Sequence, residues 1–386
     1  MINSIFRRNA FSSYVRCASG YALQFLLLLS LAACSTVSPA PGASNDERVA
    51  FIHAKADKVF QRIESKHGPG LVAWIELDGQ AVYKNSAGLA DKNRGLFIDD
   101  NTIFELASVS KPLTATTILL LAERGQLKID DVAMKWLPEL PPNWRSITIR
   151  NLLTHSSGIP DYIKRLEISK VHELDGLTNQ NLLERWHTNL HLNFEPGTDV
   201  EYSNSNYVLL AEIISKVCNM SFGECMRQRM FDPLGMTHTR VASEMVSDEP
   251  LALNYASTTL THGINLLTEG PIGIFSSITD MATWLHAFQA GNIVSNETVA
   301  LMTTPASTKP ANESGEFYGM GWFLPSKNSP AGTYAHIGQK DGYRTLIKAN
   351  PKRHLNFIIF DNGGDLLEQE RNEIRYWFQQ AFENYP

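Results

Sequence analysis

The stretch FELASVSKP, residues 104–112, stands directly before a long apolar run with the character of a helix. On the first turn of a helix, positions i and i+3 share one face, so we expect Ser108 and Lys111 to point the same way. A serine hydroxyl is a weak nucleophile at neutral pH unless a base accepts its proton. A lysine serves as that base only where burial and neighbouring groups lower its pKa. The spacing therefore predicts a catalytic pair, against the plainer alternative of a serine that caps a helix.

Two further short motifs carry groups that acyl transfer needs. The run Tyr202-Ser203-Asn204 offers a phenol that can shuttle protons and an amide that can hold a substrate carbonyl. The run His336-Ile337-Gly338 lies in an alternating stretch that is typical of a strand, and a strand edge offers a free N–H. The plainer alternatives are a turn ahead of a helix for the first run and a packed strand histidine for the second.

Together the three motifs resemble those of the serine β-lactamase-related hydrolases, a family that includes class C β-lactamases, D-Ala-D-Ala carboxypeptidases, D-aminopeptidases and β-lactamase-like esterases. The resemblance runs from about residue 49 to the C-terminal helix. It extends to GQLKIDD at 125–131, ITIRNLLTHSSGIP at 147–160, PLGM at 233–236 and FSSITD at 275–280. It implies an α+β fold of the β-lactamase/transpeptidase type, with an antiparallel sheet flanked by helices beside a mostly helical region.

The resemblance also implies roles for the motif residues in a two-step acyl transfer to water that needs neither metal nor organic cofactor. Ser108 attacks the substrate carbonyl and becomes acylated. Lys111 and Tyr202 together accept its proton and pass it to the leaving group. Which of the two is the primary base stays open, because such groups titrate as a pair. Asn204 binds the acyl-side amide of the substrate and helps to position the lysine.

The third motif is implied to complete the substrate-binding wall. The oxyanion hole would consist of the backbone N–H groups of Ser108 and Gln339. Gly338 would allow the strand to approach closely, since it has no side chain. His336 would contact the substrate. His155, although it stands beside two serines in the segment 147–160, is predicted to be structural.

The sequence departs from the family pattern at two places. His336 stands where many members carry a lysine, whose fixed charge attracts a substrate carboxylate, and a histidine is mostly neutral near pH 7. This favours an esterase, amidase or peptidase over a β-lactamase, although Lys340 and Arg344 are near enough in sequence to supply the charge. Ile272 replaces a glycine that is usual in the family, which affects the shape of the neighbouring loop.

The chain as a whole has the composition of a globular protein. Of its 386 residues, 43% are hydrophobic and 19% are charged, which is enough apolar material for a large core. The formal charge is −6 and no basic run occurs, which argues against a nucleic-acid partner. Residues 46–386 are predicted to form the catalytic domain, its sheet built from about 46–107 and 268–386 and its helical region from about 108–267.

Local patterns predict several elements of this domain. Helix-like periodicity covers residues 46–65, and 366–382 is predicted to be a terminal helix. Two apolar stretches flank Asp78-Gly79, which is a strong hairpin signal. Three further strands are predicted near the C-terminus, over 334–339, 343–349 and 355–360.

The N-terminal 33 residues read as a signal peptide. Three arginines precede an apolar run, which ends in the sequence LAAC at 31–34. That ending looks like a bacterial lipobox, which implies acylation at Cys34, a tether over 34–45, and a lipid-anchored, periplasm-facing protein in the cell envelope, in the outer membrane. The membrane is then a partner through this anchor. The alternative is an ordinary secretory signal with an incidental cysteine.

Two cysteines lie in the predicted catalytic domain. Cys218 and Cys225 are predicted either to form a disulfide, if the compartment is oxidising, or to be two buried thiols. The sequence holds no CxxC and no HExxH, and no metal site is predicted.

The expected substrates are short acyl esters or D-amino-acid peptides of the cell-wall type. An idle relative that binds wall peptides or an envelope partner is the alternative, and a β-lactamase ranks third; protein partners stay open.

Overall fold

The computed structural model describes residues 38–40, 42–167, 176–186, 190–245, 249–255, 267–325 and 332–383. The predicted signal peptide, residues 1–33, and the predicted lipidation site, Cys34, lie outside this part of the chain. Within it, no helix is both long enough and apolar enough to cross a bilayer.

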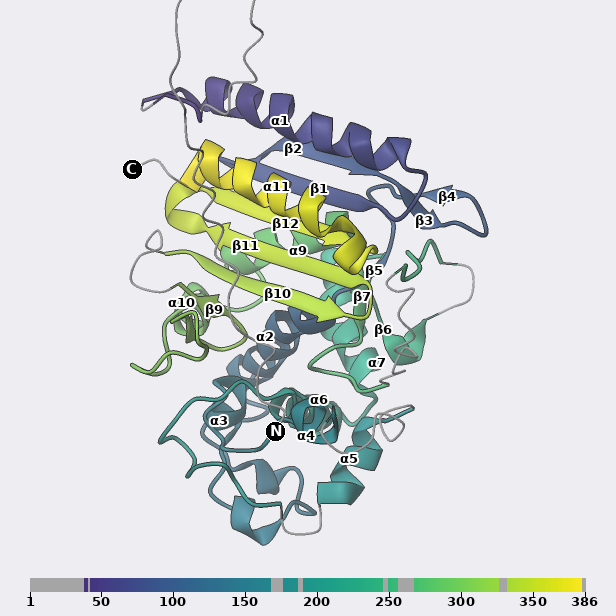
Figure 1. The fold of residues 1–386 in the computed structure, drawn as a ribbon. Helices are drawn as coiled ribbons and strands as arrows, with labels where there is room; N and C mark the ends of the chain where they lie inside the picture. Colours follow the sequence, from purple (N-terminus) through teal and green to yellow (C-terminus); the bar gives the residue numbers. More distant parts are fainter. Residues whose placement is uncertain are drawn as a thin grey trace, which may run out of the picture. The chain divides into compact units, whose positions relative to one another are not determined.

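The centre of the fold is a seven-stranded antiparallel sheet to which both ends of the domain contribute (Figure 1). Its strand order is β2–β1–β12–β11–β10–β9–β8. This confirms the predicted fold class, because the strands come from the N-terminal hairpin and from the C-terminal third of the chain. The bounds are β1 Leu71–Leu77, β2 Gln80–Ala87, β8 Phe317–Tyr318, β9 Phe323–Leu324, β10 Tyr334–Lys340, β11 Tyr343–Asn350 and β12 Leu355–Asp361.

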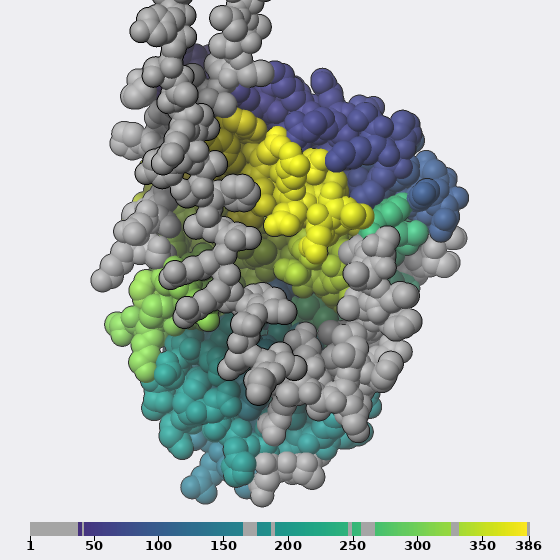
Figure 2. Space-filling view, in the orientation of Figure 1, coloured from purple at the N-terminus to yellow at the C-terminus, as the bar shows by residue number. Residues whose placement is uncertain are grey.

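Two helices cover one face of this sheet. Helix α1 (Asn45–Ser65) and helix α11 (Glu368–Phe378) lie side by side across it, as Figures 1 and 2 show. Helix α1 begins with a capping box between Ser44 and Glu47, which satisfies the first free N–H groups of the helix. Its apolar stripe packs with those of α11 and the sheet in one core, which includes Ile52, Val59, Ile75, Phe357, Ile374 and Phe378.

The other face of the sheet packs against the helical part of the molecule. Helix α2 (Ser110–Glu123) is buried all round from Ser110 to Leu121, so it has no polar face turned to solvent, and even Lys111 and Thr114 lie in the interior. Helices α6 (Asn204–Cys218) and α9 (Ile278–Gln289) share its core, in which Trp284 stacks on Phe288 and Trp322. The shorter helices are α3 Ile149–Leu153, α4 Tyr162–Glu167, α5 Asn179–Trp186, α7 Phe222–Met226, α8 Asp232–Leu234 and α10 Asn296–Met302.

The fold also contains short strands that local sequence patterns did not predict. A small sheet joins β5 (Phe104–Glu105) to β7 (Ile274–Ser276) and β7 to β6 (Arg240–Val241), and β6 falls inside the range predicted to be mostly helical. A second small pair joins β3 (Leu89–Asp91) to β4 (Leu96–Phe97). Strands of two or three residues have no readable periodicity, and β5 pairs with a segment far away in sequence.

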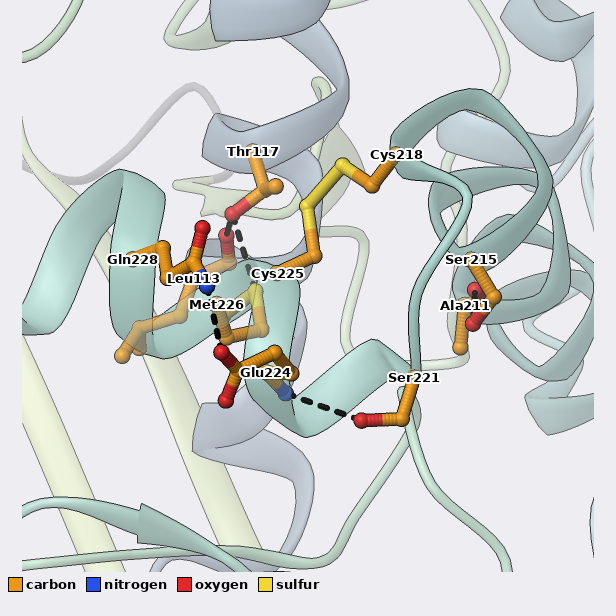
Figure 3. The surroundings of a disulfide bond; sticks show 10 residues. All are labelled: Leu113, Thr117, Ala211, Ser215, Cys218, Ser221, Glu224, Cys225, Met226 and Gln228. Atoms are coloured by element: carbon orange, nitrogen blue, oxygen red, sulfur yellow. Dashed lines mark hydrogen bonds between the residues drawn. A yellow bond between two sulfur atoms is a disulfide. The ribbon is translucent and has the colours of Figure 1, made fainter.

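Cys218 and Cys225 form a disulfide, and their Cα atoms are 6.1 Å apart (Figure 3). Helix α6 ends at Cys218 and is capped by Asn219, whose φ of 54° is left-handed; α7 begins after Ser221, whose side chain accepts a hydrogen bond from Glu224 N. This tight turn brings the two cysteines together. Of the two alternatives that the sequence left open, the structure therefore selects the disulfide.

Candidate active site

Ser108 lies on a short 3₁₀ turn, Ala107–Val109, that leads directly into α2. The residue before it, Ala107, has a φ of 48°, which is strained for a residue with a side chain. Ser108 is half-buried, and its backbone N–H has no hydrogen-bond acceptor within the part of the chain that the structure describes. The strained turn thus exposes both a hydroxyl and a free N–H at one point.

Lys111 lies beneath Ser108 and is fully buried. Its Nζ is 3.0 Å from Ser108 Oγ, 2.8 Å from Asn204 Oδ1 and 3.0 Å from the carbonyl oxygen of Pro271. Burial lowers the pKa of Lys111 to about 7, and the negative charge of Asp161 opposes this shift. A substantial fraction of the lysine is therefore neutral near pH 7, and a neutral amine can accept a proton from the serine.

Tyr202 lies on the other side of Ser108. Burial raises the pKa of Tyr202 above its usual range, and the nearby Ser108 hydroxyl acts in the opposite direction. The ring stacks on Phe323, with centroids 5.7 Å apart, and Lys111 Nζ lies 4.8 Å from the centre of the tyrosine ring. The phenol is therefore protonated at neutral pH, next to both the nucleophile and the lysine.

Asn204 holds Lys111 in place and is itself held by a buried carboxylate. It is the first residue of α6, and its side-chain oxygen accepts a hydrogen bond from Lys111 Nζ. Its Nδ2 and its backbone N both donate to Asp161 Oδ2, at 2.9 Å and 3.1 Å. Asp161 Oδ1 accepts from Ile163 N at the start of α4. Asp161 was not among the residues predicted from the sequence, although it directly follows the segment 147–160.

His336 lies on β10 and is 1% exposed. The carbonyl oxygen of Ile337 lies 3.0 Å from its Nδ1, and the hydroxyl of Tyr318 lies 3.2 Å from its Nε2. With Nδ1–H as the donor, Nε2 accepts from the tyrosine. Burial, with a smaller effect of the nearby Lys111 charge, lowers the pKa of His336 to about 3, so the ring is neutral. Both ring nitrogens have partners inside the protein, and contact with a substrate stays a prediction.

The two cations named as substitutes for the missing lysine charge are both paired. Lys340 Nζ lies 2.6 Å from Glu105 Oε2, and that carboxylate is 2% exposed. Arg344 Nη2 lies 3.0 Å from Asp365 Oδ1. Lys340 is therefore neutralised by a buried carboxylate, whereas the partner of Arg344 is exposed to solvent.

Gly338 marks the point where β10 passes closest to the serine turn. A Cβ atom there would lie 2.2 Å from the carbonyl oxygen of Leu106 and 2.2 Å from Thr345 Oγ1, distances that no side chain can occupy. Thr345 Oγ1 itself donates to the Leu106 oxygen at 2.7 Å. The strand edge is thus held against the segment that carries Ser108.

Gln339 follows on the same strand. Lys340 pairs with Tyr343 across the two-residue turn, and Gln339 pairs with Arg344. Hydrogen-bonded and non-hydrogen-bonded pairs alternate along an antiparallel ladder, so when the pair that closes the turn is hydrogen-bonded, the Gln339 N–H points away from β11. The N–H therefore points to the side of β10 on which β9 lies. Strand β9 pairs with β10 only at Ala335, so it leaves the edge of β10 open at Gln339.

The loop that contains Ile272 completes the wall around Lys111. Two glycines with left-handed φ values, Gly270 at 105° and Gly273 at 86°, flank the segment. Ile272 is buried, and the loop directs the carbonyl oxygen of Pro271 at Lys111.

Within the described ranges, no group of three or more His, Cys, Asp or Glu side chains is arranged to hold a metal ion.

Comparison with known proteins identifies relatives over nearly the whole domain. The Beta-lactamase family matches residues 56–382. Penicillin-binding protein 4* of Bacillus subtilis (strain 168) is 31% identical over 336 residues, which are 81% of this chain and 72% of that protein.

Two solved structures have a similar fold. D-amino acid amidase from Ochrobactrum anthropi SV3, complexed with D-phenylalanine, matches with a TM-score of 0.69 and 21% identity, over 86% of this chain and 99% of that one. EstCE1, described as a hydrolase with promiscuous acyltransferase activity, matches with a TM-score of 0.72 and 21% identity, over 85% of this chain and 98% of that one. At these identities, the likeness is one of fold alone.

Proposed function

The chain belongs to the beta-lactamase family, and on that premise we propose that it is a working serine hydrolase that forms an acyl-Ser108 intermediate. The observation that carries the proposal is the contact between a buried lysine with a pKa of about 7 and the serine hydroxyl, 3.0 Å apart. A lysine with an ordinary pKa would be almost entirely protonated at neutral pH and would not act as a base.

The reaction proceeds in two steps. Ser108 Oγ attacks the substrate carbonyl carbon while its proton moves to the neutral Lys111, and the leaving amine or alcohol takes up a proton as its bond to carbon breaks. Water then attacks the acyl group, its proton returns through the same base, and the serine is released together with a carboxylic acid. Tyr202, protonated and close to Ser108, is placed to pass the proton onward. Lys111 is the better initial base because it is the one of the pair that is deprotonated near pH 7.

The negative charge that develops on the carbonyl oxygen requires donors. The free N–H of Ser108 and that of Gln339 at the edge of β10 are proposed to supply them. Loss of one such donor typically lowers the rate by about 100- to 1000-fold. Gly338 keeps the two donors close, because the strand can approach the serine turn only without a side chain there.

The charges around the site favour substrates that have no carboxylate beside the scissile bond. His336 is neutral, and Lys340 is paired with Glu105. Short acyl esters, D-amino-acid amides and D-amino-acid peptides whose scissile bond lies away from the C-terminal carboxylate are therefore the proposed substrates. The names of the two similar structures, an amidase and a hydrolase with acyltransferase activity, support these classes. A β-lactamase ranks behind them, because β-lactam substrates carry a carboxylate.

The alternative is an idle relative that binds wall peptides without turning them over. The intact set of Ser108, Lys111, Tyr202 and Asn204 favours an enzyme, since binding alone needs no base with a lowered pKa. The experiment incubates the chain and Ser108→Ala with p-nitrophenyl acetate, D-phenylalanine amide, a D-Ala-D-Ala peptide and a penicillin. Turnover is followed together with the intact protein mass.

An acyl adduct or turnover that Ser108→Ala abolishes would support the enzyme. Ligand binding that is equal in both proteins, with neither adduct nor turnover, would support the idle binder. A lasting penicillin adduct with no hydrolysis of the ester or amide would move the proposal toward the peptidoglycan enzymes.

We also propose that Cys34 carries the lipid anchor and that the domain faces the periplasm. The support is the sequence LAAC at 31–34 behind an apolar run with arginines before it. Cys34→Ser is expected to release the protein from the membrane fraction, because acyl chains provide the anchoring energy. Unchanged fractionation of the variant would overturn this proposal.

A further inference from the structure

His155 lies directly behind Tyr202 and is fully buried. It follows α3 with a φ of 56°, a left-handed conformation that is uncommon for a residue with a side chain. Its ring centre is 4.5 Å from that of Tyr202 and 4.5 Å from that of Tyr318. A strained backbone conformation persists only where the surrounding structure fixes it, so the contacts of His155 must hold the residue in this position.

Hydrogen bonds from His155 fix the chain on both sides of Tyr202. The carbonyl oxygen of His155 accepts from Glu201 N at 3.0 Å. Its Nδ1 accepts from Ser203 N at 3.2 Å and lies 3.1 Å from Asn206 Nδ2. The residues immediately before and after Tyr202 are therefore both bound to one histidine.

The same contacts set the tautomer of the ring. Asn206 Oδ1 accepts from Ser157 Oγ at 2.6 Å, which leaves Asn206 Nδ2 as a donor toward His155. With two donors facing it, Nδ1 is unprotonated and the ring proton lies on Nε2. Nε2 is buried and has no hydrogen-bond partner among the described residues.

The unpaired Nε2–H of His155 is unfavourable, which indicates that the other ring nitrogen, Nδ1, has a role. A buried N–H without a partner is unfavourable; a phenylalanine would remove that N–H, but it would leave the donors Ser203 N and Asn206 Nδ2 without their acceptor. The feature that phenylalanine lacks is the acceptor Nδ1. Burial, helped by the nearby Lys111 charge, keeps the pKa of His155 well below its usual value, so the acceptor persists across the physiological pH range.

We infer that His155 is a positioning residue of the reaction, whose Nδ1 holds the Ser203 peptide and thereby directs the Tyr202 hydroxyl at Ser108. The inference rests on the proposed function, since it concerns the proton path of that same site. His155 itself does not touch the reacting atoms.

Two substitutions of His155 test the contribution of the acceptor atom and that of the ring separately. In His155→Asn, Oδ1 can replace Nδ1, and asparagine tolerates a positive φ. In His155→Phe, the ring remains and the acceptor is lost. We expect His155→Phe to lower the acylation rate constant about 100-fold with KM nearly unchanged, because a small misplacement of a catalytic group has an effect of that size. His155→Asn is expected to stay within about tenfold of wild type on the same grounds.

Crystal structures of both variants give a readout that does not depend on activity. The Tyr202 hydroxyl should keep its wild-type position near Ser108 in His155→Asn and move away in His155→Phe. A wild type without turnover would contradict the proposed function, whereas an unmoved hydroxyl in His155→Phe would overturn the positioning role. Equal rate losses in both variants would also overturn it, because they would assign the effect to ring packing.

If His155→Phe does not fold, Asn206→Asp tests the same contact. A carboxylate opposite Nδ1 favours a proton there, which removes the acceptor from Ser203 N while the histidine ring stays. The same rate loss is expected, with Asn206→Leu, which leaves Ser203 N bound, as the matched control. An Asn206→Asp variant as fast as Asn206→Leu would overturn the inference.

Discussion

Asp161 is joined to Lys111 by a single side chain, the amide of Asn204. The amide nitrogen donates to Asp161 at 2.9 Å and the amide oxygen accepts from Lys111 at 2.8 Å. Burial lowers the pKa of Lys111, and the carboxylate charge opposes that shift, so that the value comes to about 7. The relay thus both orients the lysine and sets the pH at which it becomes a base.

The first prediction concerns the pH dependence of acylation. The base must be neutral, so below the pKa of Lys111, about 7, the acylation rate should rise about tenfold per pH unit and then level off. Pre-steady-state release of p-nitrophenol between pH 5 and 9 measures it, with Ser108→Ala as the background. A rate that does not change over this range would contradict Lys111 as the base.

The second prediction uses stability and needs no substrate. The pKa of Lys111 is about 7 in the folded protein and 10.5 in its unperturbed state, so between these values the folded state binds fewer protons than the unfolded one. Stability should therefore rise with pH across this window and fall as pH drops toward 7. Chemical denaturation of wild type and Lys111→Met at several pH values should show wild type gaining stability relative to the variant from pH 7 to 10. Parallel curves would refute the lowered pKa.

The third prediction removes the charge of Asp161. Because this carboxylate raises the pKa of Lys111, Asp161→Asn should move the acidic limb of the acylation profile to lower pH. It should also destabilise the fold by about 1–3 kcal/mol, since three donors from Asn204 and Ile163 share the carboxylate. Asp199→Asn, which removes an exposed carboxylate paired with Lys309, is the matched control. A limb that moves equally in both variants would assign the effect to net charge.

Local sequence patterns predicted much of the fold because the energies that form these elements are themselves local. The apolar spacing of α1 and the pairing across Asp78-Gly79 are both visible within short windows, and the turn has the two positive φ values, 52° and 75°, that such a hairpin needs. Strand β5 was missed because two residues become a strand only when a distant partner, β7, is present.

The motif residues of the candidate site were predicted from the sequence, but the residues that hold them in place were not. Ser108 and Lys111 are three positions apart, so their contact follows from helical geometry. Asp161 and Glu105 act through partners that the fold brings from elsewhere, Asn204 and Lys340 respectively. No short-range pattern encodes such contacts, and for the same reason the pairing of Lys340 with Glu105 could not be predicted from the sequence.

The fourth prediction concerns the disulfide. Cys218 and Cys225 close a loop with a sequence separation of 7, and such a crosslink is expected to stabilise the fold by about 2 kcal/mol. Reduction with dithiothreitol should lower the free energy of unfolding of wild type by that amount. A double variant, Cys218→Ala with Cys225→Ala, should be insensitive to the reductant, and a wild type that is equally insensitive would show that the bond contributes nothing.

The last prediction concerns the approach of β10 to the serine turn. In Gly338→Ala, the new methyl group would lie 2.2 Å from the Leu106 carbonyl oxygen, and a backbone atom cannot move aside as a flexible side chain can. The strand must shift away from Ser108, so we expect a loss of stability of about 1–3 kcal/mol. The acylation rate should fall by about 100-fold or more, since the Gln339 N–H would leave the oxyanion position.

Gly68→Ala is the matched control for this substitution. A Cβ atom at Gly68 meets only the Lys66 carbonyl oxygen, at 3.9 Å, and its φ lies outside the left-handed region. The control should stay within about 0.5 kcal/mol of wild type and keep full activity. Thermal unfolding and burst kinetics of both variants decide the matter. If Gly338→Ala loses stability but keeps its acylation rate, the strand is needed only for packing, and Gln339 does not form the oxyanion hole.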